Sequence, residues 1–111
     1  MATISNLVVD QGTTFSSIIT ITNQDGTPMD LTGYSVKSQF RKSYQSSTAI
    51  NFTASIYDAG AGEVRLQLAP ADTTGVRAGR YLYDIELTSP SNEKIRALEG
   101  LVILTPEITK T

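Results

Sequence analysis

Hydrophobic residues alternate with polar ones along most of the chain, and this period of two is typical of β-strands. The clearest run is residues 34–41, YSVKSQFR, whose first, third and seventh residues are apolar and therefore share one face. Residues 63–68 and 80–87 repeat the pattern. Strands with one apolar and one polar face are typical of antiparallel sheets that cover a core on one side only.

Four further segments are expected to be strands with a less regular pattern: residues 4–9, 14–22, 50–57 and 94–104. The last of them is apolar on both faces over residues 101–104, which indicates an inner strand or a strand that a partner covers. Its alternation breaks near Glu99 and Gly100, and a glycine inside a strand is typical of a bulge or a bend.

Turn residues separate the seven segments at intervals of roughly 8–12 residues, a spacing typical of sandwiches and barrels. Residues 60–62, Gly-Ala-Gly, are expected to close a hairpin, since they lack the lysine and the following helix that a phosphate-binding loop needs. Helix is expected only at residues 70–74, PADTT, as a single turn that ends at Gly75. The polar residues 42–48 are expected to form a mobile loop.

The pattern therefore predicts an all-β fold, an antiparallel immunoglobulin-like β-sandwich of about seven strands. Residues 1–104 are expected to form this single domain, and residues 105–111 an extended C-terminal arm. The alternation also predicts the side chains of the core: Ile19, Ile21, Leu31, Val36, Phe40, Phe52, Ile56, Val64, Leu66, Leu68, Tyr81, Tyr83, Ile85, Leu101 and Ile103.

The charge, the missing residue types and the length of the apolar runs limit the classes of function that the chain can have. The 111 residues carry a net charge of −2, with acids and bases interleaved, so no basic surface for nucleic acid or an anionic membrane is expected. The chain has no Cys and no His, which excludes thiol nucleophiles, thiolate zinc sites and imidazole catalysis. The longest apolar run, residues 101–104, is far shorter than the ~20 residues of a membrane helix. A protein without enzymatic activity and without a cofactor is therefore expected.

Three acidic loop residues are candidates for calcium binding. Asp25, Asp30 and Asp58 carry the carboxylate oxygens that calcium prefers. Their spacing matches no EF-hand loop, and Asp beside or near Gly is typical of turns. We therefore expect structural turns at these positions, with a cation site as the minor alternative.

A second acidic pair lies within one strand. Asp84 and Glu86 are two residues apart and so share the outward face. A glycosidase pair would need carboxyl groups on both sides of a cleft. Cross-strand pairing with Arg65, Lys94 or Arg96 is the preferred interpretation.

Two tyrosines point to a known feature of sandwich folds. Tyr81 and Tyr83 lie near the start of the penultimate strand, after Ala78 and Gly79. This arrangement resembles the tyrosine corner of immunoglobulin-like domains, in which the phenol hydroxyl bonds to the main chain while the ring packs in the core. Tyr44, in the polar loop, is the tyrosine that we expect to be most accessible to a partner.

Four blocks occur in a characteristic order along nearly the whole chain. They are VDQGTT at residues 9–14, DGTPMDLTGY at residues 25–34, AGRYLYDI at residues 78–85, and EG leading into VILTPEIT at residues 99–109. In this order they resemble the small immunoglobulin-like virion proteins of tailed bacteriophages, including those of T4-like phages. They are also similar to the N-terminal domain of phage baseplate upper proteins, although the chain ends without the regions that follow in those longer proteins.

The resemblance implies a virion structural protein, made in the host cytoplasm and placed in many symmetric copies on the tail, baseplate or neck. Its partners would be other virion proteins, with contacts through strand edges and terminal arms. A capsid decoration protein and a glycan- or host-surface-binding module are the alternatives. The expected partner-contact residues are Ile4, Leu7, Val9, Arg41, Lys42, Tyr44, Pro106, Glu107 and Ile108.

Overall fold

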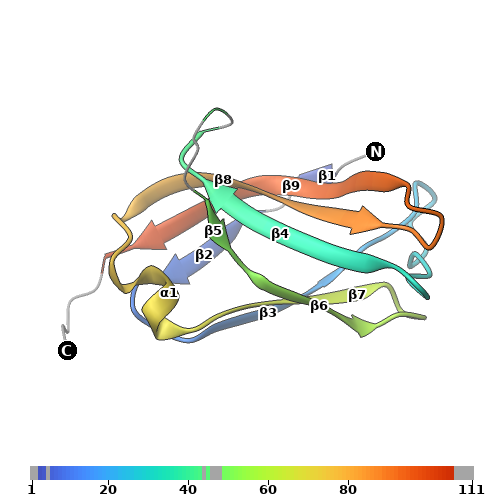
Figure 1. Ribbon diagram of the computed structural model, residues 1–111, viewed down its shortest axis with the longest axis horizontal. Coiled ribbons are helices and arrows are strands. Elements are labelled where there is room, and N and C mark those ends of the chain that lie inside the picture. Colours follow the sequence, from blue (N-terminus) through green and yellow to red (C-terminus); the bar gives the residue numbers. More distant parts are fainter. Residues whose placement is uncertain (1–2, 5, 44, 46–48, 107–111) are drawn as a thin grey trace.

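Two β-sheets pack face to face in the computed structural model, which describes residues 3–4, 6–43, 45 and 49–106 (Figure 1). The strands are β1 (Thr3–Ile4), β2 (Leu7–Asp10), β3 (Phe15–Thr20), β4 (Ser35–Arg41), β5 (Ile50–Asn51), β6 (Thr53–Asp58), β7 (Glu63–Leu68), β8 (Gly79–Thr88) and β9 (Lys94–Thr105). The larger sheet has the order β1-β9-β8-β4-β5, with β2 also paired to β9, and the smaller sheet has the order β3-β7-β6.

This topology is that of an immunoglobulin-like β-sandwich, which confirms the fold class expected from the sequence. All strand pairs are antiparallel except those of β1 and β2, which run parallel to β9. The first and last strands of the described chain therefore lie side by side at one edge of the larger sheet (Figure 1).

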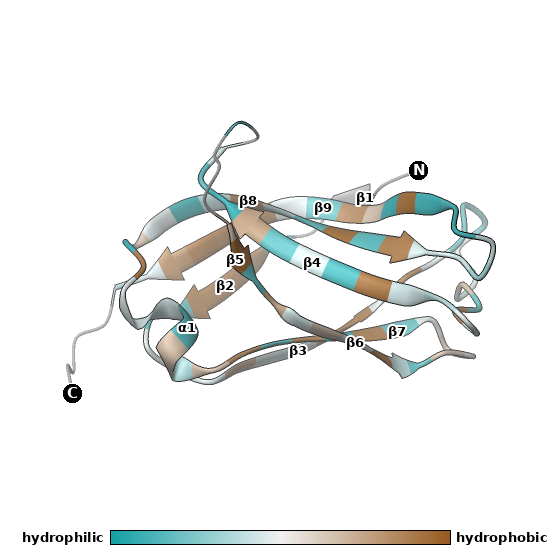
Figure 2. Cartoon of the chain, in the orientation of Figure 1, coloured by the Kyte–Doolittle hydropathy of each residue, from teal (hydrophilic) through white to brown (hydrophobic). Residues whose placement is uncertain are grey.

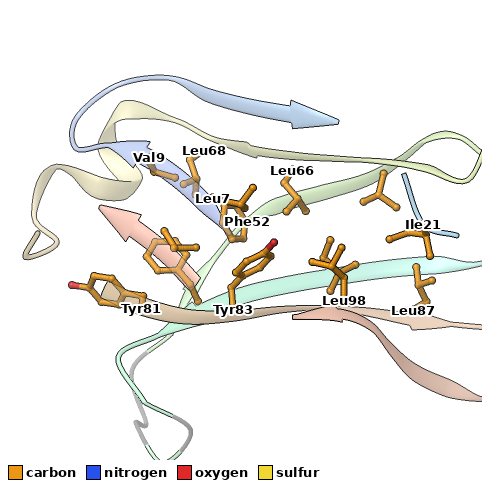
Figure 3. Packing of buried hydrophobic residues seen from close by; sticks show 14 of the residues in the cluster. Leu7, Val9, Ile21, Phe52, Leu66, Leu68, Tyr81, Tyr83, Leu87 and Leu98 are labelled. Carbon is orange, nitrogen blue, oxygen red and sulfur yellow. The ribbon is translucent and has the colours of Figure 1, made fainter. Parts of the chain in front are cut away.

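The chain changes sheets at Phe52, within the segment expected as one strand. β5 pairs with β4 in the larger sheet, whereas β6 pairs with β7 in the smaller one. The Phe52 ring is buried between the sheets, with centroids 5.3 Å from Phe40, 6.0 Å from Phe15 and 6.2 Å from Tyr83. One aromatic cluster thus joins both layers at the crossover, and Figure 3 shows Phe52 near Tyr83 between the two sheets.

Most of the expected core is confirmed. Ten of the expected residues are buried: Ile21, Leu31, Phe40, Phe52, Val64, Leu66, Leu68, Tyr81, Tyr83 and Ile85. Ile19, Val36 and Ile56 are half-buried and pack against this cluster. Leu7, Val9, Leu87, Leu98, Val102 and Leu104 complete it.

The prediction that Leu101 and Ile103 belong to the core is wrong. The register between β8 and β9 shifts by one residue at Ala97, because Glu86 pairs with Arg96 whereas Ile85 pairs with Leu98. A one-residue shift turns all following side chains to the opposite face. Val102 therefore faces the core, and Leu101 and Ile103 face outward. The irregularity expected near Gly100 exists, but it lies three residues earlier.

A single helical turn, α1 (Pro70–Thr74), connects β7 to β8 and ends at Gly75, as the sequence predicted. Proline at its first position suits a helix start, since that residue needs no amide donor. The side chain of Thr73 is buried, and its Oγ1 accepts a hydrogen bond of 2.8 Å from the amide of Gly12. Beside it, Gln11 Nε2 donates to the carbonyl of Val76 at 2.6 Å. These bonds fasten the turn after β2 to α1.

Candidate functional site

Four apolar side chains face outward on the larger sheet, where an isolated sandwich normally carries polar residues. They are Leu82 on β8, Leu101 and Ile103 on β9, and Val8 on β2, and we call them the outer patch. Leu82 pairs with Leu101, and Ile103 pairs with Val8, so the four lie on adjacent strands. Val8 is 61% exposed. Figure 2 shows the apolar ribbon continuing along the C-terminal half of β9 and along β2.

Charged side chains of opposite sign lie at the two ends of the outer patch. Arg80 pairs in register with Ile103 at one end, and Asp84 pairs with Glu99 at the other. The guanidinium of Arg96 lies 3.2 Å from Asp84 Oδ2 and 3.5 Å from Glu99 Oε2. The expected cross-strand pairing of Asp84 is thus confirmed with Arg96.

Arg65 belongs to the other sheet and takes no part in that pairing. It lies on β7, and its guanidinium carbon is 4.5 Å from the centroid of the Tyr57 ring. This cation–π contact covers the outside of the smaller sheet. Of the three partners expected as alternatives, Arg65 is therefore not the one that pairs with Asp84.

A shallow depression of about 500 Å³ lies over the end of the outer patch that Leu82 and Leu101 form. Leu82 and Leu101 contribute apolar lining, and Gln39, Arg41 and Asp84 contribute polar lining. Gln39 Oε1 accepts a hydrogen bond of 3.0 Å from the Arg41 guanidinium, so the two side chains are held together. The depression therefore presents oriented polar groups beside an apolar surface.

The three N-terminal residues expected to contact a partner are part of the sandwich itself. Ile4 pairs through its main chain with Glu99. Leu7 and Val9 are buried in the core of their own chain, so a partner would reach them only if β2 were exchanged between copies. The exposed apolar side chain of this strand is that of Val8, which lies between them and points the other way, as does the exposed Asp10.

The residues expected at the polar loop behave differently from one another. Arg41 lines the depression, as described above. Lys42 Nζ donates a hydrogen bond of 3.1 Å to the carbonyl of Arg80 and lies 5.2 Å from the centroid of the Tyr81 ring. Lys42 is thereby tied to the start of β8. Tyr44 lies outside the described residues.

Thr105, expected as the first residue of the C-terminal arm, belongs to the sandwich instead. Thr105 is the last residue of β9, and its Oγ1 donates a hydrogen bond of 2.7 Å to Asp10 Oδ1. Pro106 follows and is exposed. Glu107 and Ile108 lie outside the described residues.

The acidic loop residues hold turns, which confirms the preferred interpretation. Asp25 Oδ1 accepts hydrogen bonds from the amide and hydroxyl of Thr27, at 3.0 and 2.6 Å, and Asp30 accepts the same pair from Thr32, at 3.0 and 2.7 Å. In both cases the threonine hydroxyl, followed by the amide, lowers the pKa of the aspartate. Asp58 Oδ1 accepts from the amide of Ala61 in the Gly-Ala-Gly hairpin.

A metal-binding cluster and a membrane-spanning helix are both absent from the part of the chain that the structure describes. No group of three or more His, Cys, Asp or Glu side chains there is arranged to hold a metal ion. No helix in these residues is long and apolar enough to span a membrane.

Comparison with known proteins finds only distant structural likenesses, among them the two described below. No protein-family model and no curated protein matches the chain. An internalin-like protein of Listeria monocytogenes is similar over 96% of this chain, with 11% identity and a TM-score of 0.45, and the chain spans 28% of that protein's length. A structure from work on multimeric cell-adhesive interactions of VGSC beta subunits is similar over 96% of this chain and 93% of its own, with 10% identity and a TM-score of 0.40.

Proposed function

We propose that the protein is a non-enzymatic structural protein of a bacteriophage virion, present in several symmetric copies on the tail, baseplate or neck. The observation that carries the proposal is the outer patch. Its four apolar side chains face away from the core of an immunoglobulin-like sandwich and have charged residues at both ends. Val8 is exposed, and Leu82, Leu101 and Ile103 are half-buried. A partly exposed apolar surface with a polar rim is typical of a protein–protein contact.

The ordered sequence blocks support the phage setting, since they resemble those of small immunoglobulin-like virion proteins. Three of these blocks supply contacts that hold this sandwich together. Gln11 and Gly12 bond to the α1 region, Asp25 and Asp30 hold turns, and Tyr81 forms a tyrosine corner. The fold that these blocks help to hold together is of the kind that the resemblance implies, and this agreement supports the phage setting.

A second kind of contact is available at a strand edge. β3 lies at the edge of the smaller sheet, and its sequence, FSSIIT, has no charged residue. Natural proteins commonly protect open edges with charges, prolines or bulges, and unprotected edges accept a further strand. Ile18, at the middle of β3, is 44% exposed. A strand from another virion protein would extend the smaller sheet here.

Carbohydrate binding is the second candidate, and the depression over Leu82 favours it. Gln39, Arg41 and Asp84 line it with hydrogen-bonding groups of the kind that sugars use. A glycan array probed with the wild-type protein and with Arg41→Ala tests this function. Binding that the substitution abolishes would favour the glycan-binding module over the assembly protein.

Immunogold electron microscopy of particles of the encoding phage tests the proposal directly. Gold at the tail, baseplate or neck is the expected result. Gold over the head would indicate the capsid decoration protein instead. Permeabilised particles without gold would refute a virion role.

A further inference from the structure

β3 lies at an edge of the smaller sheet, and among the described residues it has a strand neighbour, β7, on one side only. Immunoglobulin-like sandwiches of the constant type have four strands in this sheet, whereas this chain has three. The strands that come first in the chain, β1 and β2, pair with β9 in the larger sheet instead. We propose that an extended segment of another virion protein takes the fourth place, beside β3. The inference rests on the proposed function and specifies the chemistry of the strand that binds.

Alternate residues of β3 direct their main-chain groups toward the open side. In an antiparallel pair, residues that bond to the neighbouring strand alternate with residues whose N–H and C=O groups point away from it. The amide of Ile21 donates a hydrogen bond of 2.7 Å to the carbonyl of Gly62, the residue before β7, so Ile21 and the odd-numbered residues of β3 face β7. Ser16, Ile18 and Thr20 therefore each offer one donor and one acceptor to an added strand.

β3 also lacks the features that protect the other edges of the described sandwich. Natural edge strands are kept from pairing by shortness, charge, proline or a bulge. β1 and β5 have two residues each, β2 ends in Asp10, and the pairing of β6 with β7 is interrupted between Ile56 and Asp58. β3 pairs with β7 in one unbroken register, and residues 11–24 contain neither a charged residue nor a proline. Among the described edges, β3 is therefore the one best suited to accept a strand.

The inward side chains of β3 are less covered than those of its neighbour. Phe15, Ser17 and Ile19 face the core but are half-buried, whereas the residues that pair with them on β7 are at most 2% exposed. A further strand would complete this part of the core with its own inward side chains. Because Ser17 is smaller than Phe15 and Ile19, a large apolar residue suits the position opposite Ser17. The partner segment should therefore alternate apolar and polar residues.

The widths of the two sheets favour a lone segment over a second folded copy. The larger sheet has five strands along its path and the smaller has three, and the two sheets meet at the edge where β5 continues into β6. The larger sheet therefore reaches past β3 at the opposite edge. A folded copy that paired its own β3 here would bring its larger sheet into collision with this one. An extended segment takes the width of one strand, about 4.8 Å, and avoids the collision.

A synthetic peptide of sequence KTVTLTVTK is the probe for the open edge. Its leucine is designed to lie opposite Ser17 and its valines opposite Phe15 and Ile19, with the threonines facing outward. Fluorescence anisotropy of the labelled peptide should show saturable binding to the full chain. A control peptide carries methyl groups on the main-chain nitrogens of its three central residues, so it keeps every side chain but loses the donors that face β3. The control should bind at least tenfold more weakly.

Two variants at one position separate the main chain from the side chain. Ile18→Pro removes an N–H group that points to the open edge, a place where edge strands tolerate proline. The dissociation constant of the peptide should rise at least tenfold. Ile18→Thr is the matched control, since it removes the exposed apolar side chain but keeps the N–H group, and it should bind the peptide as tightly as wild type. Circular dichroism checks the fold, and Thr20→Pro makes the same change if Ile18→Pro does not fold.

Peptide binding that survives methylation, or that the proline variants leave unchanged, would overturn the proposal, and so would a lack of binding at millimolar concentration. A wild-type chain that dimerises, with a dimer that Ile18→Pro abolishes, would assign the edge to a second copy instead.

The inference and the proposed function fail separately. A chain that is present in particles but does not bind the peptide would overturn the strand partner and leave the virion role. A chain that binds the peptide but is absent from particles would overturn the virion role and leave the open edge.

Discussion

The hydroxyl of Tyr81 donates a hydrogen bond to the main-chain carbonyl of Arg77, four residues earlier in the chain. Its ring is buried and packs edge-on against Phe40, with centroids 5.4 Å apart. One side chain therefore joins the loop after α1 to the core, as the resemblance to a tyrosine corner predicted.

Tyr81→Phe is expected to lower the free energy of unfolding by about 1–2 kcal/mol, because it leaves the carbonyl of Arg77 without this donor and keeps the ring. Urea denaturation measures the change. Tyr57→Phe is the matched control, since Tyr57 is 51% exposed and its ring stacks on Arg65. Equal effects of the two substitutions would show that the hydrogen bond contributes nothing.

The direction of the β9 side chains gives a second prediction. Val102→Ala should lower the free energy of unfolding by about 2 kcal/mol, since Val102 is completely buried. Leu101→Ala removes more atoms but from the outward face, and it should cost less than about 1 kcal/mol. Urea denaturation of both variants decides the register. A larger cost at Leu101 would place the bulge elsewhere.

The bulge at Ala97 also shows where the sequence stops being informative. Leu101 and Ile103 are as apolar as Val102 and Leu104, so hydrophobicity alone does not show which of the two pairs is buried in the core. The hairpin register and the extra residue decide between them, and that extra residue is fixed by packing of Leu98 opposite Ile85. The outer patch depends on this decision. The sequence indicated that a partner could cover residues 101–104, but it did not show which of these side chains face outward.

Other parts of the fold follow from local patterns and were predicted for that reason. α1 starts at a proline and ends at Gly75, and the Gly-Ala-Gly hairpin lies between two alternating segments. The change of sheets at Phe52 has no such local signal, because Phe52 continues the apolar run of its segment. Only the aromatic partners contributed by distant strands make that position the crossover.

Two glycines allow steric crowding to be separated from backbone strain. Gly62 (φ 69°) and Gly26 (φ 88°) both have positive φ, which disfavours alanine at either position. A Cβ at Gly62 would lie 2.6 Å from the carbonyl oxygen of Ile21 and 2.7 Å from that of Met29, whereas a Cβ at Gly26 meets nothing within 4 Å. Gly62→Ala should therefore destabilise the fold by about 1–3 kcal/mol more than Gly26→Ala. Similar melting temperatures for the two variants would contradict this close packing.

The aspartate turns predict a dependence of stability on pH. Hydrogen bonds from Thr27 and Thr32 lower the pKa of Asp25 and Asp30 below the ordinary value of 3.8. A lowered pKa in the folded state contributes stability that is present above the ordinary value and lost as the pH falls through the lowered one. Asp25→Asn with Asp30→Asn should melt below wild type at about pH 7, and the difference should vanish near pH 2. If the variant still melts below wild type at acid pH, the loss of stability comes from the changed side-chain geometry and not from the carboxylate charge.

Incorporation into phage particles is the most direct test of the central claim, that this sandwich is a virion protein that assembles through its outer patch. Particles are grown with the wild-type chain, with Leu82→Asp or with Tyr57→Asp, which places the same charge on an exposed side chain of β6 away from the outer patch and from β3. The particles are purified, and the copies per particle are measured by quantitative mass spectrometry. We predict full incorporation of the wild-type and Tyr57→Asp chains and severe loss of Leu82→Asp. Wild-type incorporation of a folded Leu82→Asp chain, or absence of the wild-type chain from particles, would contradict the account.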